Sequence, residues 1–456
     1  MKNFKSSLSL KLFVIGFLIA ILMIPVGMIG FLANERESRQ AEAFREVSGK
    51  WGNEQTVTGP ILSVPYKDRV ERTTSEGVIV DEVIRYAHFL PEELNISGMV
   101  DPEKRQRGIY EVVVYNANLE IGGRFLAPDF SKWDIARDKI LYDQAFVTMG
   151  IPDMRGIKNN VNLEWANEKH LFNPGVKTND VVALGINADV DLVQNNNNYD
   201  FKITLSLNGS RDIYFSPLGR VTQVELSSAW SDPSFQGAFL PESHTINEAG
   251  FTATWKVLEL NRSFPQKFLG SIGSLEPIMQ VNYRDKISAL SQADAINQSN
   301  FGVRLLVLAD EYQETVRALK YAIMLLALTF LVLFFYEAMR GVHVHPLQYI
   351  LIGLALALFY LLLLSLSEYI GFKSAYLLSA LSITGLITLY SKSIFKAWRP
   401  AFLEALILLF IYGFIFVILQ LEDYSLLVGS LGLLVILSVV MFISRKIDWY
   451  SIAQNE

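Results

Sequence analysis

The sequence contains no cysteine in 456 residues, and this absence excludes several classes of protein at once. Disulfide scaffolds, thiolate nucleophiles, cysteine-ligated zinc and iron–sulfur clusters all require that side chain. Charged residues are also scarce, at 19% of the chain, where ordinary soluble domains have about a quarter. Mean hydropathy is +0.27. Because charged residues are absent from long continuous stretches of the sequence, we expect part of the chain to lie in a membrane.

Recognition motifs are equally scarce. The net charge is −6 and no run rich in Lys and Arg appears, so nucleic acid is not an expected partner. The five histidines form no HExxH motif, and neither a Gly-rich phosphate loop nor a Gly-x-Ser-x-Gly elbow is present. His343 and His345 could ligate a metal, but solvated loop residues are the favoured interpretation. The sequence therefore predicts no catalytic, cofactor-binding or metal-binding residues.

Six apolar segments are each long enough to cross a bilayer as a helix once flanking residues are included. The first spans about 33 Å at 1.5 Å per residue and follows Lys2, Lys5 and Lys11. A cleaved signal peptide has a shorter apolar core of about 7–15 residues, so an uncleaved signal anchor is favoured. The six expected spans are residues 12–33, 321–336, 347–367, 374–391, 401–421 and 425–444.

Lys and Arg in the short loops predict the orientation, because these side chains are enriched on the cytoplasmic side. The opposite short loops hold only Lys373. Both termini are therefore expected on the cytoplasmic side of a bacterial inner membrane, and residues 34–318 on its outer side. The nine residues on the cytoplasmic side are Lys2, Lys5, Lys11, Arg340, Lys392, Lys396, Arg399, Arg445 and Lys446.

The external region is expected to be mainly β and sandwich-like, inserted between helices 1 and 2. It holds 29 Lys and Arg against 39 Asp and Glu, so its net charge is −10. Residues 34–50 are polar with helical i,i+4 charge pairs and should prolong the first span as a stalk. Residues 311–320 should form a helix leading into span two, with Asp310 as N-cap. Between them lie alternating β-branched runs at residues 78–86, 108–115, 119–125, 182–192, 201–207, 211–215 and 220–226.

The expected organisation has five parts. A cytoplasmic tail covers residues 1–11, and transmembrane helix 1 covers residues 12–33. The extracytoplasmic β domain covers residues 34–318, with two subdomains divided near residue 215, and the Asn-rich residues 194–199 are expected to be a loop. A five-helix transmembrane bundle covers residues 319–444. A second cytoplasmic tail covers residues 445–456.

Three carboxylates are the candidate functional residues, because ionisable side chains inside a membrane are costly and often mark function. Glu337 lies at a cytoplasmic span end near Arg340, and Glu368 at an outer span end. Glu404 lies about one turn inside its span near Arg399 and is the deepest. Small residues in the last span, Gly429 and Gly432 among them, indicate close helix packing.

The chain resembles the CreD family of bacterial inner-membrane proteins over nearly its whole length. In the membrane half, the resemblance rests on KYAI at 320–323, HPLQY at 345–349, FYLLLL at 359–364, LSE at 366–368 and IDWYS at 447–451. In the external half, it rests on TGP at 58–60, FLPE at 89–92, RGIY at 107–110 and PSF at 233–235. The resemblance implies a role in cell-envelope integrity and envelope stress response under the Cre two-component system, and it supplies no catalytic residues.

Two functions follow as hypotheses. The leading one is a non-enzymatic protein of the bilayer whose β domain binds an envelope component or protein partner outside the membrane. The alternative is a membrane transporter or intramembrane enzyme that uses buried carboxylates such as Glu404. The transporter or enzyme alternative requires that such a carboxylate be indispensable for function.

Overall fold

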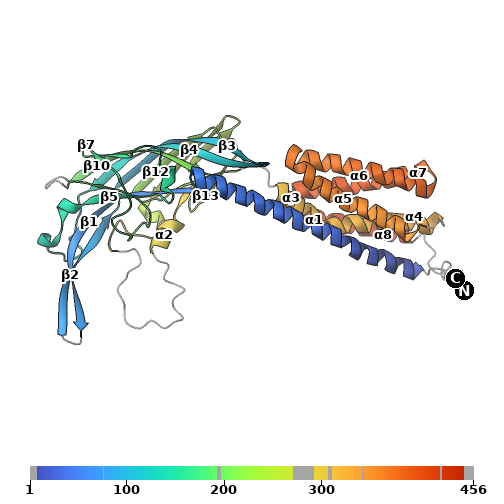
Figure 1. Cartoon of the computed structure of the whole chain (residues 1–456), viewed down its shortest axis with the longest axis horizontal. Coiled ribbons are helices and arrows are strands. Elements are labelled where there is room, and N and C mark those ends of the chain that lie inside the picture. Colours follow the sequence, from blue (N-terminus) through green and yellow to red (C-terminus); the bar gives the residue numbers. More distant parts are fainter. Residues whose placement is uncertain are drawn as a thin grey trace. The chain divides into compact units, whose positions relative to one another are not determined.

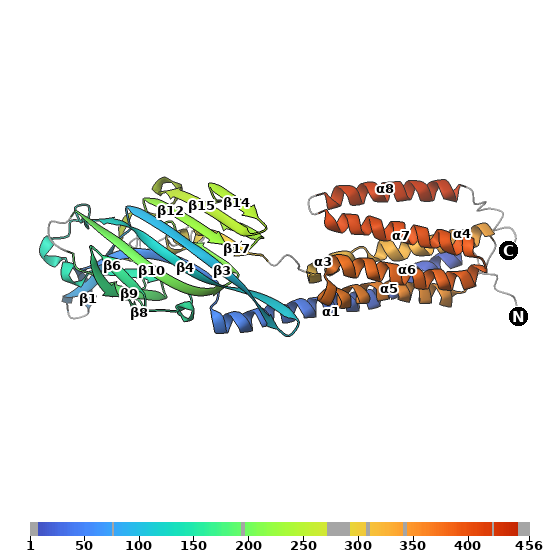
Figure 2. The same cartoon turned by 90° about the horizontal axis from the view of Figure 1, so that it is seen from above.

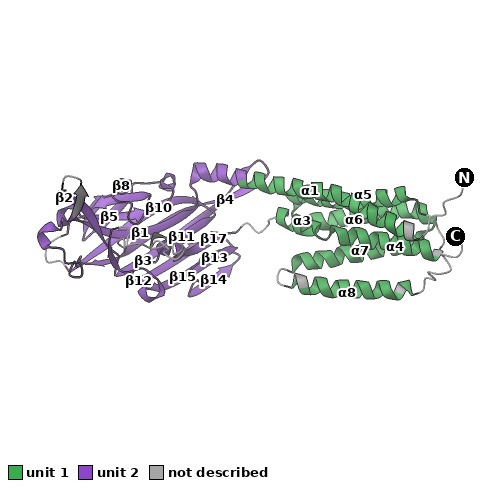
Figure 3. Cartoon of the chain, turned by 90° about the horizontal axis from the view of Figure 1, so that it is seen from below, with its two compact units in different colours: residues 1–41, 309–456 green, residues 42–308 purple. Residues whose placement is uncertain are grey.

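The chain forms two compact units, each described here by itself. The computed structural model describes residues 8–74, 77–192, 197–270, 292–306, 311–340, 344–421 and 424–445. Residues 1–41 and 309–456 make a helical unit, and residues 42–308 make a mainly β unit (Figure 3). Helix α1 (Leu8–Trp51) contributes residues to both units.

The helical unit contains five helices that are long and apolar enough to cross a membrane: α1, α4, α5, α6 and α7. Helix α8 is also apolar but its fully described stretch is shorter. The expected stalk and the expected helix before span two are both helical, in α1 and in α3; Asp310 lies outside the described residues. After α1, the helices are α3 (Glu311–Leu319), α4 (Ala322–Arg340), α5 (Pro346–Ile370), α6 (Phe372–Phe395), α7 (Trp398–Gln420) and α8 (Ser425–Ser444).

The ends of α5 show why these residues begin and end a helix. His345 is the N-cap residue, and its Nδ1 accepts a hydrogen bond from the Leu347 backbone N–H at 3.2 Å. The Gln348 side chain accepts in return from the His345 backbone N–H at 3.0 Å. Pro346 occupies the first helical position, where its missing N–H costs nothing. At the other end Gly371 has φ of 76°, a conformation that favours glycine.

The outer faces of these helices are apolar, as expected for side chains that meet lipid. On α5, the exposed residues Leu347, Leu351, Leu354, Leu358 and Leu361 recur every three or four positions and so share one face. The opposite face is buried in the bundle. A surface of this kind would be an aggregation liability in water and is stable in a bilayer.

The β unit consists of two sheets (Figures 1 and 2). One has nine strands in the order β13-β17-β11-β1-β5-β9-β8, with β2 paired to β1 and β16 to β2. Its strands are β1 (Gln55–Thr74), β2 (Gly77–Phe89), β5 (Phe146–Gly150), β8 (Asn173–Pro174), β9 (Gly185–Asp189), β11 (Asp212–Phe215), β13 (Pro233–Gly237), β16 (Lys267–Leu269) and β17 (Phe301–Leu305).

The other sheet has eight strands in the order β14-β15-β12-β3-β4-β10-β6-β7. Its strands are β3 (Glu93–Arg107), β4 (Tyr110–Leu126), β6 (Asn162–Trp165), β7 (Glu168–Leu171), β10 (Asn198–Ser210), β12 (Val221–Ser228), β14 (Ser243–Asn247) and β15 (Gly250–Leu258). A short helix, α2 (Gln292–Gln298), precedes β17.

One hydrophobic core joins both sheets and stabilises them. Ile61 and Leu62 of β1 belong to the same buried cluster as Ile121 of β4 and Trp255 of β15. Each sheet therefore buries one face, and β10 alternates buried and exposed residues along its first eight positions. Strands from both sides of residue 215 are neighbours in both sheets, since β12 pairs with β3 and β17 with β11. The expected division near residue 215 does not separate the two sheets.

Most expected strands are present, with different boundaries. Residues 78–86, 201–207, 211–215 and 220–226 fall in β2, β10, β11 and β12. The separate strands expected at 108–115 and 119–125 are one strand, β4, which begins at Tyr110. Only Gly185–Asp189 of residues 182–192 is a strand. Within the expected Asn-rich loop, residues 194–196 lie outside the described residues, and β10 begins at Asn198.

Candidate functional site

Glu337 forms a buried ion pair with the first helix rather than a free charge. Its Oε1 accepts from Lys11 Nζ at 2.7 Å and from the Val344 backbone N–H at 3.2 Å. Its Oε2 accepts from the Tyr349 hydroxyl at 3.3 Å. The side chain is 9% exposed. A buried carboxylate with these donors is well satisfied, so Glu337 joins α1, α4 and α5 and is left with little capacity for a ligand.

Glu368 makes a matching contact near the opposite end of α5. Its Oε1 lies 3.7 Å from Arg36 Nε and accepts from the Tyr312 hydroxyl at 3.1 Å. Arg36 and Lys11 are 25 residues apart on α1, or about 37 Å at 1.5 Å per residue. Two carboxylates therefore hold α1 against the other helices of this unit at well separated points.

Glu404 differs from both because it is buried without a partner. It is 2% exposed on α7, and neither carboxylate oxygen has a hydrogen-bond partner in the described part of the chain. The Ser391 hydroxyl faces it but does not reach hydrogen-bonding geometry. Arg399 is exposed and forms no described ion pair with it. Within helices α5 to α7, buried hydroxyls that also lack a partner among the described residues are those of Tyr360, Ser379, Thr384, Ser391 and Tyr412.

The three carboxylates are thus not brought together into one site. Two are ion-paired to α1, and one lies on α7 near the Ser391 hydroxyl of α6 without a hydrogen-bond partner among the described residues. An unpaired buried carboxyl is costly, so Glu404 is the one of the three with free capacity to bind a proton, a cation or a polar group.

A histidine in the β unit has partners that the sequence did not reveal. Ser63 of β1 and His88 of β2 are cross-strand partners, and Ser63 Oγ lies 2.9 Å from His88 Nδ1. His88 Nε2 lies 3.2 Å from Asp180 Oδ2. Burial by itself raises the pKa of Asp180, but the hydrogen bonds from His88 and Thr178 outweigh it and the pKa is lowered. Because Ser63 and His88 are each only 1% exposed, a substrate carbonyl has no approach to this serine. The trio fixes the segment around Asp180 to the sheet.

A surface cleft of about 460 Å³ lies in the β unit and combines apolar and charged side chains. Its aromatic wall is Trp133, which packs edge-on against Phe89 and Phe130 with ring centroids 5.8 and 5.7 Å apart. Leu90 and Leu126 add apolar surface. Three of the four residues of the FLPE segment line it, which is the sequence signal that marks the cleft.

The charged side chains of the cleft are paired with one another. Arg220 lies 3.1 Å from Glu92 and 3.4 Å from Glu259. Lys267 donates to Asp129 at 2.7 Å and lies 5.6 Å from the centre of the Trp133 ring. This hydrogen bond is the main reason that the pKa of Asp129 is lowered. With Lys132, the lining has three acidic and three basic side chains, so the cleft is neutral on a unit whose net charge is negative.

A half-buried guanidinium, that of Arg262, braces the chain beside the cleft. Arg262 donates to the Phe264 and Leu218 carbonyls at 2.7 and 3.3 Å and also to the Gln266 side chain. Gln266 in turn donates to the Pro91 carbonyl at 2.5 Å. Burial lowers the pKa of Arg262 to about 10, which leaves it charged at neutral pH. The cleft is therefore preformed, which reduces the ordering cost of binding.

The described residues contain no group of three or more metal-ligating side chains. His345 serves as the N-cap of α5, and His343 lies outside the described residues. Gly432 packs on α7 as expected, since a Cβ there would overlap the Phe414 ring, whereas Gly429 has no neighbour that a Cβ would meet.

Comparisons with known proteins agree over nearly the full chain. A family model described as inner membrane protein CreD matches residues 7–450. The inner membrane protein CreD of Escherichia coli (strain K12) is 30% identical over 437 residues, which covers 95% of this chain and 92% of the relative. An M1 zinc metallopeptidase from Deinococcus radiodurans, bound to a Tyr-Ser-Ala substrate, aligns with 37% of this chain and 39% of that chain at a TM-score of 0.19 and 8% identity, too low to carry an argument.

Proposed function

The chain belongs to the CreD family of inner membrane proteins, and from this premise we propose that it supports cell-envelope integrity by binding an envelope component outside the membrane. The observation that carries the proposal is the preformed cleft beside Trp133. An aromatic wall flanked by paired charges suits a ligand with both apolar and polar faces. The neutral lining disfavours a polyanion.

Substitution at the aromatic wall tests the cleft. Trp133→Ala removes the largest apolar surface and should weaken binding at least about tenfold, since buried aromatic residues dominate binding energy. The measurement is recovery of envelope resistance in a deletion strain, together with protein level. Trp230→Ala is the matched control, because Trp230 is a half-buried tryptophan of the same unit outside the cleft. Equal recovery by both variants would refute the cleft as the site.

Photo-crosslinking would identify the envelope component that binds in the cleft. A photo-crosslinking amino acid at Lys132, on the rim of the cleft, should trap an envelope component in intact cells. The same group at Lys256, on β15 and outside the cleft lining, is the control. Identical products from both positions would show that capture reflects abundance rather than binding.

The topology that the proposal requires has six spans, with α8 as the sixth, both termini in the cytoplasm and residues 34–318 outside. Its support is the nine-to-one asymmetry of Lys and Arg between the short loops. A periplasm-active reporter should work after Asn196 and fail after Glu456. The reverse result would overturn the orientation.

A second candidate function is transport or intramembrane catalysis, favoured by the unpaired Glu404. It predicts that Glu404→Gln or Glu368→Gln abolishes the envelope phenotype while protein levels stay unchanged. The binding proposal predicts the opposite pattern: Glu404→Gln retains function and deletions within the β unit abolish it. One complementation experiment therefore distinguishes the two.

A further inference from the structure

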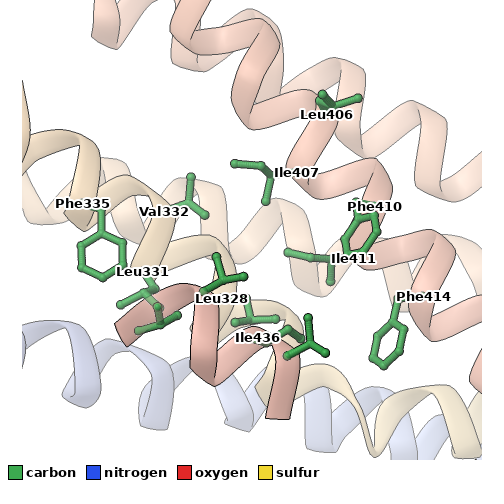
Figure 4. A pocket seen from close by; sticks show the side chains of 13 residues that line it. Leu328, Leu331, Val332, Phe335, Leu406, Ile407, Phe410, Ile411, Phe414 and Ile436 are labelled. Carbon is green, nitrogen blue, oxygen red and sulfur yellow. The ribbon is translucent and has the colours of Figure 1, made fainter. Parts of the chain in front are cut away.

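An apolar groove opens within the helical unit between α4, α7 and α8 (Figure 4). Its volume is about 430 Å³, and all thirteen side chains that line it are Leu, Ile, Val or Phe. Leu328 and Val332 come from α4, Ile407 and Phe410 from α7, and Ile436 from α8 (Figure 4). Water has no polar partner on these walls, and apolar cavities of this kind stay dry.

Helix α8 contacts α7 and α4 at two described points that bracket the part of α8 lining the groove. Gly432 packs against Phe414 of α7, and Val440 packs against the pair Phe334 and Phe335 of α4. These points are eight residues apart, or about 12 Å along α8. Between them the side chains of α4, α7 and α8 do not close the space, although helix interfaces normally pack without such voids. A bound apolar chain restores the missing contacts.

Two cations lie beyond the lining residues, one near the start of α7 and one at the end of α8. Arg399 is in the first turn of α7, and Arg445 directly follows α8. Arg399 precedes Leu406 of the lining by seven residues, and Arg445 follows Val440 by five, or about 10 and 8 Å along the helices. Both are exposed. Trp398, which precedes Arg399, is 56% exposed, with Lys392 Nζ 4.1 Å from its ring centre, and an exposed tryptophan of this kind is typical of a membrane interface.

We propose that this groove binds one acyl chain of an anionic phospholipid, whose headgroup phosphate is held by Arg399 and Arg445. The apolar lining selects a hydrocarbon chain, the surrounding bilayer supplies it, and the two guanidinium groups select the negative headgroup. The lipid thereby joins α8 to the rest of the bundle. This site is independent of the cleft in the β unit.

Native mass spectrometry of the purified full chain in detergent tests the proposal, with phosphatidylglycerol and phosphatidylethanolamine of identical chains as probes. Wild type should retain phosphatidylglycerol preferentially. Ile436→Trp and Leu406→Trp fill the groove from two different walls, and each should lower the apparent affinity at least about tenfold. Leu437→Trp and Leu409→Trp are matched controls at exposed positions of the same helices outside the groove lining and should retain the lipid.

The headgroup is tested separately. The double variant Arg399→Gln with Arg445→Gln should lower phosphatidylglycerol binding about tenfold, to the level of phosphatidylethanolamine, and leave phosphatidylethanolamine binding unchanged. Equal retention of both lipids by wild type would overturn the headgroup assignment. Unchanged binding in either groove-filling variant would overturn the chain site, and the two variants keep this test available if one fails to fold. The proposal would also be overturned if the groove proved to hold a second copy of this chain, or only detergent, where the lipid is expected.

Discussion

Asp153 shows how one side chain fixes the exit of α1 into the β unit. Its carboxylate accepts from the Asn53 backbone N–H at 2.9 Å and from Arg155 Nε and Nη2 at 2.8 Å each. The side chain is 8% exposed. The Arg155 hydrogen bond is the largest cause that lowers the pKa of Asp153, and it outweighs the opposing effect of burial. A carboxylate of this kind stabilises the fold in its ionised form.

We predict that Asp153→Asn lowers the free energy of unfolding at neutral pH by about 1–3 kcal/mol, because the Arg155 donors lose a charged acceptor. The pKa is lowered in the folded state, so the contribution is present above the unfolded pKa and is lost as pH falls through the folded one. The deficit of the variant should therefore shrink in acid. Urea unfolding followed by tryptophan fluorescence measures it, since five of the seven tryptophans lie in residues 42–308. Asp200→Asn, at an exposed position, is the control, and a deficit independent of pH would contradict the assignment.

The three membrane carboxylates show which properties of a single side chain can be predicted from the sequence. Their positions near span ends were readable from hydropathy, but their partners were not. Arg340 and Arg399 are nearest in sequence, whereas the described ion pairs join Glu337 to Lys11, 326 residues away, and Glu368 to Arg36. Which helix faces lie together is a tertiary property, so sequence ranked Glu404 first by depth and could not show that it alone of the three lacks a partner.

Helix α8 offers a matched pair of glycines for testing helix contact. A Cβ at Gly432 would overlap the Phe414 ring, while a Cβ at Gly429 would meet nothing within 4 Å. We predict that Gly432→Ala destabilises the bundle by about 1–3 kcal/mol, the usual cost of overpacking. Gly429→Ala should be neutral or slightly stabilising, because alanine favours the helix. Thermal unfolding in detergent compares them, and equal midpoints would show that α7 and α8 do not pack through Gly432.

The strands show a different limit of sequence interpretation. Runs with strong β-branched alternation were located correctly, as in β10 and β12, because their buried faces carry the signal. The strand β14 was missed, since it is an edge strand with all five residues exposed and so lacks an apolar face. The whole of β3 was missed, and its second half lacks an apolar face for the same reason, being charged and exposed while it pairs along β4. The parallel pairing of β12 with β3 is non-local and leaves no local mark.

At the scale of the whole molecule, the two units place their apolar side chains in opposite ways. The helical unit satisfies its backbone within helices and presents apolar side chains outward. The β unit buries its apolar side chains in one core between two sheets and presents charge outward. Each unit thus has its own source of stability, and the chain needs no cysteine for either.

We therefore predict that the β unit folds when separated from the membrane helices. A fragment of roughly residues 50–307, which omits nearly all of α1 and all of α3, retains every strand and the joint core, and a chain of this length buries enough surface to be stable. It should be soluble and give a β-type circular dichroism spectrum, unchanged by a chelator because the described residues hold no metal-ligating cluster. Adding back residues 42–49 restores the Arg107–Glu46 ion pair and the hydrogen bond from Arg155 to the Gly49 carbonyl, and should raise the unfolding midpoint slightly. A helical spectrum would contradict the two-sheet fold, and unfolding by chelator would reveal a structural metal.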